Sequence, residues 1–313
     1  MQVTVGMGPR SRPAGESGLG WVRGRLLWVY AVLAVPLAWV LAFVAWPSFS
    51  TLWQSLWALD AVGRPTGFAG LGNFRALFAQ PLFSEVTLNT VTYAVAATGL
   101  SVAAALGLAV VLARVRRDQV GARGLLIALF SPTVMPAIAA ANLWLYFLAP
   151  RIGVVDWLLR ALGSGGENWL GQPGSALAVL VALFVWKYAP YFTLFLLAGM
   201  QAIPPNLRDA LRLDDPRGFS AWRRVLLPLL APMLLFVTVL ALLYAVETVD
   251  PVYVMTQGGP NNATDLVMYY LYQLGFEFFA WGPAAALSAL LMTVLSTLSG
   301  LSLIVLERKA FHW

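Results

Sequence analysis

The chain has 313 residues, of which 60% are hydrophobic and 11% charged, and its mean hydropathy is +0.75. A soluble domain carries about 25% charged residues, so these charges are too few to cover a globular surface, and the composition indicates an integral membrane protein. The absence of cysteine excludes disulfides and thiolate metal sites, and a single histidine, His312, leaves almost no material for histidine-based catalysis or metal binding.

The N-terminal segment, residues 1–25, is rich in Gly, Ser, Arg and Pro and predicts a disordered cytoplasmic tail. The apolar stretch Leu26–Trp46 follows it. This stretch is longer than the roughly 7–15 residues of a signal-peptide core. We therefore expect it to be an uncleaved first membrane helix.

Membrane-spanning helices need about 20 apolar residues each. Apolar runs that meet this length predict six helices, at 26–47, 89–113, 124–148, 174–199, 228–249 and 281–306. Open sheet cannot lie in hydrocarbon, so the predicted fold class is an all-α integral membrane bundle. One membrane domain then covers residues 26–306, and residues 307–313 form a short C-terminal tail.

Loop charges set the expected orientation. Fifteen lysines and arginines fall on one side: Arg10, Arg12, Arg23, Arg25, Arg114, Arg116, Arg117, Arg123, Arg208, Arg212, Arg217, Arg223, Arg224, Arg308 and Lys309. Only Arg64, Arg75, Arg151 and Arg160 fall on the other. The pattern predicts that both termini are cytoplasmic, and it explains the net charge of +6 without nucleic-acid binding.

Lys187 lies near the middle of the predicted fourth helix, with Glu247 and Asp250 near the outer end of the fifth as possible counter-charges. A charge within a membrane segment is a candidate functional residue because a lipid-facing charge is costly. A structural ion pair between helices is the alternative. Aromatic and amide side chains of the kind that bind sugars, or that pack helices, are Tyr188, Tyr191, Asn142, Trp144, Tyr244 and Tyr253.

The cytoplasmic loop 204–228 predicts two short helices with a break between them. Pro204-Pro205-Asn206 is typical of a helix start, and Asp209 falls in the first turn, where a carboxylate suits the helix dipole. Pro216 disfavours α geometry at the preceding residue. A second helix then runs through Ser220–Leu227 into the fifth membrane helix.

The stretch Asp250–Asp265 predicts a polar loop between the last two membrane helices. Its Gly258-Gly259-Pro260-Asn261 run cannot continue a helix and has turn chemistry at nearly every position. The distribution of Lys and Arg places this loop on the extracytoplasmic side of the membrane. The loop contains acidic residues but neither Lys nor Arg.

Both loops resemble those of ATP-binding cassette (ABC) importer permeases. In that family Glu-Ala-Ala is followed after three residues by Gly and after nine more by Ile-x-Leu-Pro. The matching positions here are Asp209, Ala210, Leu211, Asp215, Val225, Leu227 and Pro228, with the spacing unaltered. Departures are Asp209 for Glu, Leu211 for Ala, Asp215 for Gly and Pro216 for a small residue; Pro216 and Gly218 offer another route to the break.

Further matches lie at the same topological places along nearly the whole chain after residue 25. They include Gly70–Phe74, Asn89-Thr90, Trp186–Phe192, Leu197–Pro204 and Tyr270–Ala286. The resemblance is nearest to the first of the two permeases in maltose, glycerol-phosphate and oligosaccharide importers, in the plain six-helix form.

The resemblance implies a carbohydrate permease of a bacterial or archaeal cell (inner) membrane, embedded in lipid. Its implied partners are a second permease, two ATPase subunits and an extracytoplasmic sugar-binding protein that docks on the outer loop. One ATPase subunit would bind the loop 204–228. The chain lacks the Gly-Lys-Ser/Thr end of a P-loop, so ATP and Mg²⁺ are expected on the ATPase subunits. Neither metal, cofactor nor catalytic residue is expected here.

Three alternatives stay open. The same architecture can import another solute, such as an amino acid, a peptide or a phosphate compound. A self-sufficient secondary transporter would work alone on an ion gradient and usually contains internal repeats. A membrane enzyme would need a cluster of titratable groups within the helices, which Lys187 alone does not supply.

Overall fold

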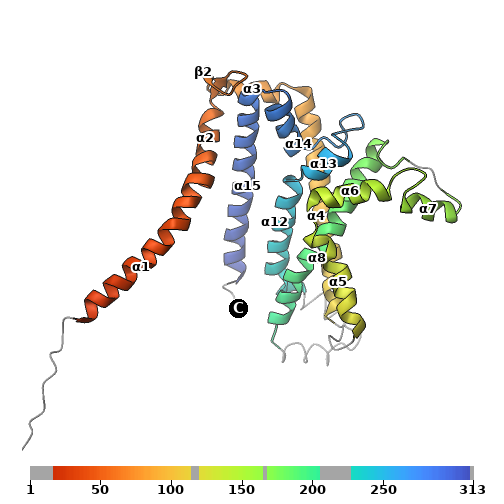
Figure 1. The fold of residues 1–313 in the computed structure, drawn as a ribbon, viewed down its shortest axis with the longest axis horizontal. Coiled ribbons are helices and arrows are strands. Elements are labelled where there is room, and N and C mark those ends of the chain that lie inside the picture. The colour runs from red at the N-terminus through yellow and green to blue at the C-terminus, as the bar shows by residue number, and fades with distance from the viewer. Residues whose placement is uncertain (1–16, 114–119, 165–167, 205–226, 311–313) are drawn as a thin grey trace, which may run out of the picture. The chain divides into compact units, whose positions relative to one another are not determined.

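The computed structural model describes residues 17–113, 120–164, 168–204 and 227–310, without the side chains of 17–27, 120–123 and 306–310. Helices dominate this part of the chain (Figure 1). Two compact units, Met1–Trp53 and Gln54–Trp313, divide the chain and are described in turn.

The described part of the first unit consists of consecutive helical segments. They are α1 (Ser17–Val40), a π-helical turn η1 (Leu41–Ala45) and α2 (Trp46–Gln54). Pro47 has no N–H for the carbonyl four residues earlier, which is a common cause of a local change in helical winding. Residues Trp28–Gln54 are long and apolar enough to span a membrane, so the helix expected at 26–47 is present and continues farther.

The second unit begins with a small hairpin that the sequence did not predict. Strand β1 (Trp57–Leu59) pairs antiparallel with β2 (Pro65–Phe68), with Trp57 opposite Phe68. Asp60 Oδ1 accepts the N–H groups of Val62 and Arg64, which stabilises the turn. Trp281 Nε1 donates to Ala61 O at 3.0 Å and so joins the hairpin to the start of the last helix.

Helix α3 (Gly72–Phe78) follows the hairpin and is fixed to it by one side chain. Asn73 Nδ2 donates to the carbonyl oxygens of Ser55 and Trp57, each at 2.8 Å. Gly282 is required beside this amide, because a Cβ at that position would lie 2.6 Å from Asn73 Oδ1. The hairpin, α3 and the beginning of the last helix are therefore held together.

Four long helices form the body of this unit: α4 (Pro81–Leu112), α8 (Pro173–Ala202), α12 (Ala231–Val246) and α15 (Trp281–Ala310). They run side by side in Figure 1. Helix α4 turns a line of small buried residues toward the interior, namely Ala94, Ala97, Ser101, Ala105 and Ala109. Small residues let helices approach closely, and α4 packs most extensively against α8.

Between α4 and α8 the predicted third helix is broken. Helix α5 (Val120–Val134) and α6 (Ala137–Phe147) meet at a bend of 108°. Pro136 has no N–H for Pro132 O and disfavours α geometry at Met135, so the helix cannot continue. The span expected at 124–148 is thus a bent pair of helices, which together are apolar and long enough to count as one span.

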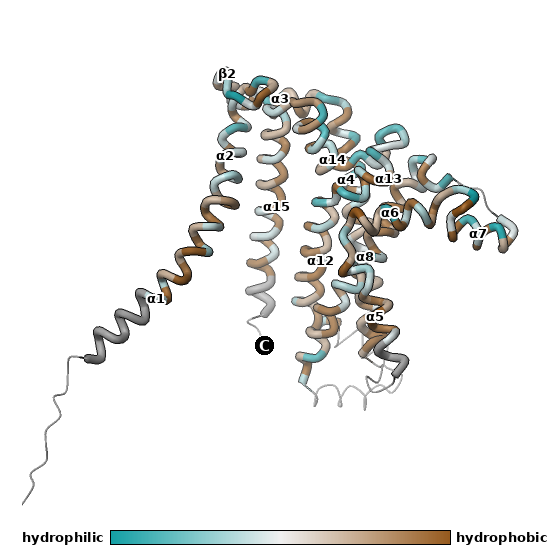
Figure 2. The backbone as a smooth tube through the Cα atoms, in the orientation of Figure 1, coloured by the Kyte–Doolittle hydropathy of each residue, from teal (hydrophilic) through white to brown (hydrophobic). Residues whose placement is uncertain are grey.

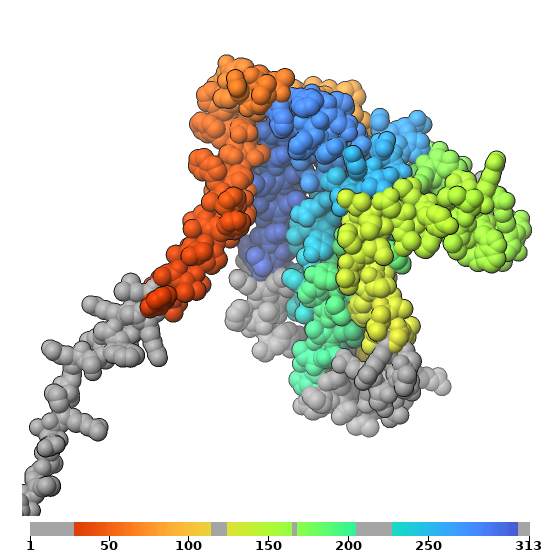
Figure 3. Space-filling view, in the orientation of Figure 1, coloured from red at the N-terminus to blue at the C-terminus, as the bar shows by residue number. Residues whose placement is uncertain are grey.

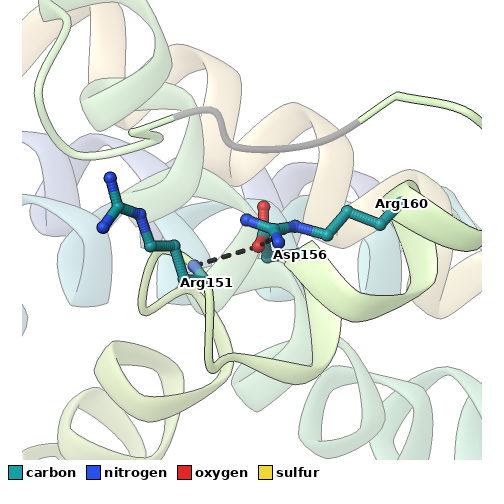
Figure 4. Close-up of polar contacts among 3 residues, drawn as sticks. All are labelled: Arg151, Asp156 and Arg160. Carbon is teal, nitrogen blue, oxygen red and sulfur yellow. Dashed lines mark hydrogen bonds and ion pairs between the residues drawn. The ribbon is translucent and has the colours of Figure 1, made fainter.

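Helix α7 (Val154–Ala161) follows α6 and carries a buried carboxylate. Asp156 is 2% exposed, and its Oδ2 accepts the backbone N–H of Arg151 at 2.9 Å and Arg160 Nε at 2.8 Å (Figure 4). Arg151 and Arg160, which the sequence predicts on the extracytoplasmic side, thus both contact the Asp156 carboxylate. Arg151 does so through its backbone N–H and Arg160 through its side chain.

The chain after α12 is irregular before the last helix. It contains α13 (Asp250–Met255), α14 (Val267–Tyr272) and the π-helical turn η3 (Gln273–Glu277). A single helical turn, α11 (Leu227–Leu229), directly precedes α12. Hydrophilic stretches gather at the end of the second unit that carries α3, α13 and α14, whereas the long helices are mainly apolar (Figure 2).

Five helices in the described residues are long and apolar enough to span a membrane, and the bent α5–α6 pair makes six. The other candidate spans are Pro81–Leu112, Pro173–Ala202, Ala231–Met255 and Trp281–Val305. The chain is a multi-pass, all-α bundle in its apolar part, as the sequence predicts.

Candidate functional site

A cavity of about 330 Å³ lies among α4, α6, α8 and the end of α12. Five of the nine residues predicted for a solute path line it: Lys187, Tyr188, Tyr244, Glu247 and Asp250. The remaining lining residues are Tyr93, Ala137, Leu183, Phe184, Thr248, Val249 and Pro251. Binding pockets of small molecules combine an apolar wall with a few polar groups in this way.

Lys187 occupies the middle of α8 and is 5% exposed. Its Nζ donates to Pro132 O at 3.3 Å and makes a second, shorter hydrogen bond to Met135 O. Pro136 offers no N–H to Pro132 O, which accepts the N–H of Met135 at 3.3 Å beside the ammonium group. The ammonium group therefore caps the C-terminal end of α5, where a helix favours positive charge.

The predicted counter-charges do not pair with this lysine. No carboxylate of the described residues lies within 4.0 Å of Lys187 Nζ. Glu247 directly follows α12, and Asp250 begins α13; both are exposed and line the cavity. The interhelical ion pair considered from the sequence is thus replaced by a cation-to-carbonyl contact.

Aromatic rings form one wall of the cavity. Tyr188 lies 4.7 Å from Phe184 and 5.4 Å from Tyr244, centroid to centroid. Lys187 Nζ is 5.3 Å from the Tyr188 ring centroid, within the range of a cation–π contact. Tyr93, which sequence reasoning missed, is fully buried and donates from its hydroxyl to Thr248 Oγ1 at 3.5 Å.

Four predicted path residues do not line the cavity. Tyr191 stacks on Tyr244 with centroids 6.1 Å apart, so it supports the wall from behind. Trp144 packs on Trp186, and the exposed Asn142 donates to Ile138 O of its own helix. Tyr253, in the segment 250–255, is 47% exposed, and its ring contacts those of Tyr269 and Tyr272.

Helix α6 closes one side of this region. It lies against α13 (Figure 3), and its first residue, Ala137, lines the cavity. Its direction is set by the bend at Pro136, and Lys187 Nζ donates to the carbonyl groups just before this bend. The proline pair Pro132 and Pro136 is the sequence signal that identifies this arrangement.

The predicted docking loop is a compact turn tied to α4. Gly258 is buried with φ +83°, a conformation that favours glycine. Thr264 Oγ1 donates to Gly259 O at 2.6 Å, and Asn89 Nδ2 donates to Asn262 O at 2.8 Å. Asn261, one residue after Pro260, is exposed at the tip.

Asp265 closes this loop and was not singled out from the sequence. It is 2% exposed, and its Oδ1 has no hydrogen-bond partner. Burial, with smaller contributions from Glu85 and Glu277, raises the pKa of Asp265 to about 7. The next turn is fixed by Val267 N, which donates to Thr90 Oγ1 at 2.8 Å.

Most of the predicted coupling loop lies outside the described residues, namely Asp209, Ala210, Leu211, Asp215, Pro216, Gly218 and Val225. Its last two positions, Leu227 and Pro228, fall in α11. Metal binding gains no support from the described part of the chain, which has no group of three or more His, Cys, Asp or Glu able to hold an ion.

Comparison with known families decides the class of this bundle. Residues 105–312 match the family described as binding-protein-dependent transport system inner membrane component. The chain belongs to this family. It is therefore a membrane component of a transporter and not an enzyme.

Curated relatives agree along the length of the chain. The sn-glycerol-3-phosphate transport system permease protein UgpA of Brucella abortus is 32% identical over 284 residues, which cover 90% of this chain and 96% of the relative. The trehalose/maltose transport system permease protein MalF of Thermococcus litoralis is 33% identical over 265 residues, which cover 83% and 87%.

Solved structures share the fold. A chain of a bacterial ABC transporter involved in import of the acidic polysaccharide alginate superposes with a TM-score of 0.78 at 22% identity, covering 93% of this chain and 98% of that one. A second structure, of the bacterial alginate transporter with an alginate pentasaccharide-bound periplasmic protein, gives a TM-score of 0.77 at 21% identity, covering 89% and 93%.

Proposed function

We propose that this chain is the first permease subunit of an ATP-driven importer of a carbohydrate or related polyol. It would form the pathway together with a second permease. The observation that supports this most strongly is the cavity at the middle of α8, where tyrosine rings and two exposed carboxylates meet. Such groups suit sugars, because rings contact their apolar faces and carboxylates accept bonds from their hydroxyls.

The solute would be delivered by an extracytoplasmic binding protein. The names of the family and of its relatives support this partner, and the compact loop Gly258–Asn261, with its exposed tip, is the surface that we assign to docking. The charge distribution supports both termini in the cytoplasm, and the lengths of the apolar helices support six spans. The organisms of the relatives support a bacterial or archaeal cell membrane.

Two ATPase subunits would supply the energy and bind ATP with Mg²⁺. One of them would bind the loop 204–228 on the cytoplasmic side. ATP binding and hydrolysis would then rock the two permeases between outward and inward access. The sequence spacing from Asp209 to Pro228 supports this assignment.

The test is reconstitution of the chain in liposomes, with and without the second permease, the ATPases and the binding protein. We expect uptake only in the complete system and only with ATP. Uptake by this chain alone, without ATP, contradicts the proposal. A ligand screen of the binding protein identifies the solute to be supplied.

The coupling loop has its own test. Asp209→Lys in the complete system is expected to weaken ATPase association and to lower ATP-driven uptake, because it reverses a charge at the start of the predicted coupling helix. Glu85→Lys, a charge reversal at an exposed position of α4, serves as the control. Unchanged association and uptake in Asp209→Lys remove this residue from the coupling role.

A further inference from the structure

The charge of the cavity depends on what Lys187 does. Its ammonium group is engaged by two backbone carbonyl oxygens, those of Pro132 and Met135, and the residue is 5% exposed. Two of the three N–H groups of the ammonium are used in this way, and a solute anion that drew the ammonium group away would weaken both contacts. Lys187 is thus a positioning residue at the α5–α6 bend, and its positive charge is directed to the carbonyl end of α5.

The two acids of the cavity are in a different situation. Glu247 and Asp250 are exposed, and neither forms an ion pair with a described residue. No arginine or histidine lines the cavity, and Lys187 is its only lysine among the described lining residues. The surface that a solute meets therefore carries two carboxylates. Its one ammonium group, that of Lys187, is already hydrogen-bonded to backbone carbonyl oxygens.

This arrangement discriminates between classes of carbohydrate. Sugar hydroxyls donate to carboxylates, and the faces of sugar rings lie against aromatic rings such as those of Tyr188 and Tyr244. A phosphate or uronate group can only accept hydrogen bonds at neutral pH and is repelled by both acids. The single positive charge of Lys187 is held at the end of α5 and does not offset the two negative charges.

We propose that the cavity selects an uncharged, polyhydroxylated solute, a neutral saccharide, and rejects phosphorylated and uronate sugars. This inference rests on the proposed function, since it concerns the same pathway. It separates the chain from those relatives and fold neighbours whose names specify an anionic solute, such as glycerol 3-phosphate or alginate. The volume of about 330 Å³ lies within the range of small-molecule sites.

The absence of cysteine allows a direct test of the cavity's charge. Ala137→Cys places one thiol on the cavity wall, and Ser164→Cys places a control thiol at an exposed position away from it. In the assembled transporter, each thiol reacts with a trimethylammonium thiosulfonate or with a sulfonate thiosulfonate. Mass spectrometry of this chain gives both reaction rates, and their ratio is compared between the two variants.

We expect the cation-to-anion rate ratio to be about tenfold higher at the cavity thiol than at the control thiol, because local potential concentrates the reagent of opposite charge. Glu247→Gln with Asp250→Asn should return the ratio to the control value. Glu85→Gln, which removes an exposed carboxylate that does not line the cavity, should leave the ratio raised. A ratio at or below the control value, or one that survives the double substitution, overturns the inference.

Uptake separates this inference from the function on which it rests. The complete system in liposomes is supplied with maltose or trehalose as neutral probes and with sn-glycerol 3-phosphate or a diuronate as anionic probes, alongside the solute identified by the binding-protein screen. ATP-driven uptake of an anionic solute overturns the inference and leaves the importer intact. Failure of ATP to drive uptake of the identified solute overturns the importer, while the reagent ratio still decides the charge of the cavity.

Discussion

Two buried charges in the second unit are accommodated in different ways. Lys187 in α8 is 5% exposed and has two carbonyl acceptors, whereas Asp265 before α14 is 2% exposed and its Oδ1 has none. The cation can stay charged because a broken helix presents its carbonyl end. The anion instead favours its protonated form, with a pKa of about 7. Burial alone therefore does not predict whether an ionisable side chain keeps its charge.

The comparison predicts its largest effect at the lysine. Lys187→Met should remove the donor of Met135 O and one of the two donors of Pro132 O, at a cost of about 1–3 kcal/mol of stability, and should lower ATP-driven uptake at least about tenfold by disturbing the α5–α6 bend. Thermal unfolding in detergent and uptake in liposomes measure both. Arg75→Met, at an exposed cation, is the control; equal behaviour of the two variants would show that the cap is dispensable.

Removing the charge of Asp265 should raise stability, whereas removing that of Lys187 should lower it. Asp265 binds its proton more tightly in the folded chain, with a pKa of about 7 against an ordinary 3.8. Between these two pH values the unfolded chain has lost a proton that the folded chain retains, so stability falls as pH rises through this window and the loss is complete above it.

Asp265→Asn imitates the protonated form and should therefore raise stability at pH 8 by about 1–2 kcal/mol. It should also flatten the decline of Tm between pH 4 and pH 7. Unfolding scans at several pH values provide the measurement. A variant that follows the wild-type pH profile would assign that profile to other groups.

A third prediction concerns how the loop of Asp265 is held to α4. Thr90→Val keeps the shape of the side chain but removes the acceptor of Val267 N, at a cost of about 1–2 kcal/mol. Hydrogen exchange at the amide of Val267 should become faster. Thr87→Val is the matched control, since Thr87 bonds only to Phe83 O in its own helix; the same exchange in both variants would argue against the tie.

The smallest effect is expected at the ring beside the lysine. Tyr188→Leu removes the aromatic face that lies 5.3 Å from Lys187 Nζ, which should lower stability by no more than about 1 kcal/mol. Tyr188→Phe keeps the face and should be closer to wild type in a thermal unfolding scan. If the phenylalanine variant loses as much as the leucine variant, the hydroxyl matters and the ring face does not.

The sequence predicted which residues lie in these regions better than it predicted their contacts. Lys187, Glu247 and Asp250 were proposed as solute-path residues with possible mutual charge pairing, and they line one cavity. The ion pair that the sequence left open does not form, because the lysine instead donates to backbone carbonyl groups at the bend. Pro132 and Pro136 signal that bend, but hydropathy alone counts their segment as one apolar run.

Other elements were hidden for similar reasons. The hairpin of residues 57–68 is too short to give an alternating pattern, and it is fixed by Asn73 from the following helix. Asp265 has an ordinary acidic position in the sequence, and its burial comes from contacts with α4 that lie more than 170 residues away along the chain. Nonlocal contacts of this kind leave no periodic trace.

The missing N–H of Pro136 also links two positions whose identities would otherwise vary independently in evolution. A relative with a different residue at this position supplies its own donor to the preceding helical turn, and a lysine at the position of Lys187 then competes with that donor for one of its acceptors in an apolar bundle. Substitutions at the two sites are therefore expected to arise together. Aligned relatives should sort into those that keep both proline and lysine and those that have neither.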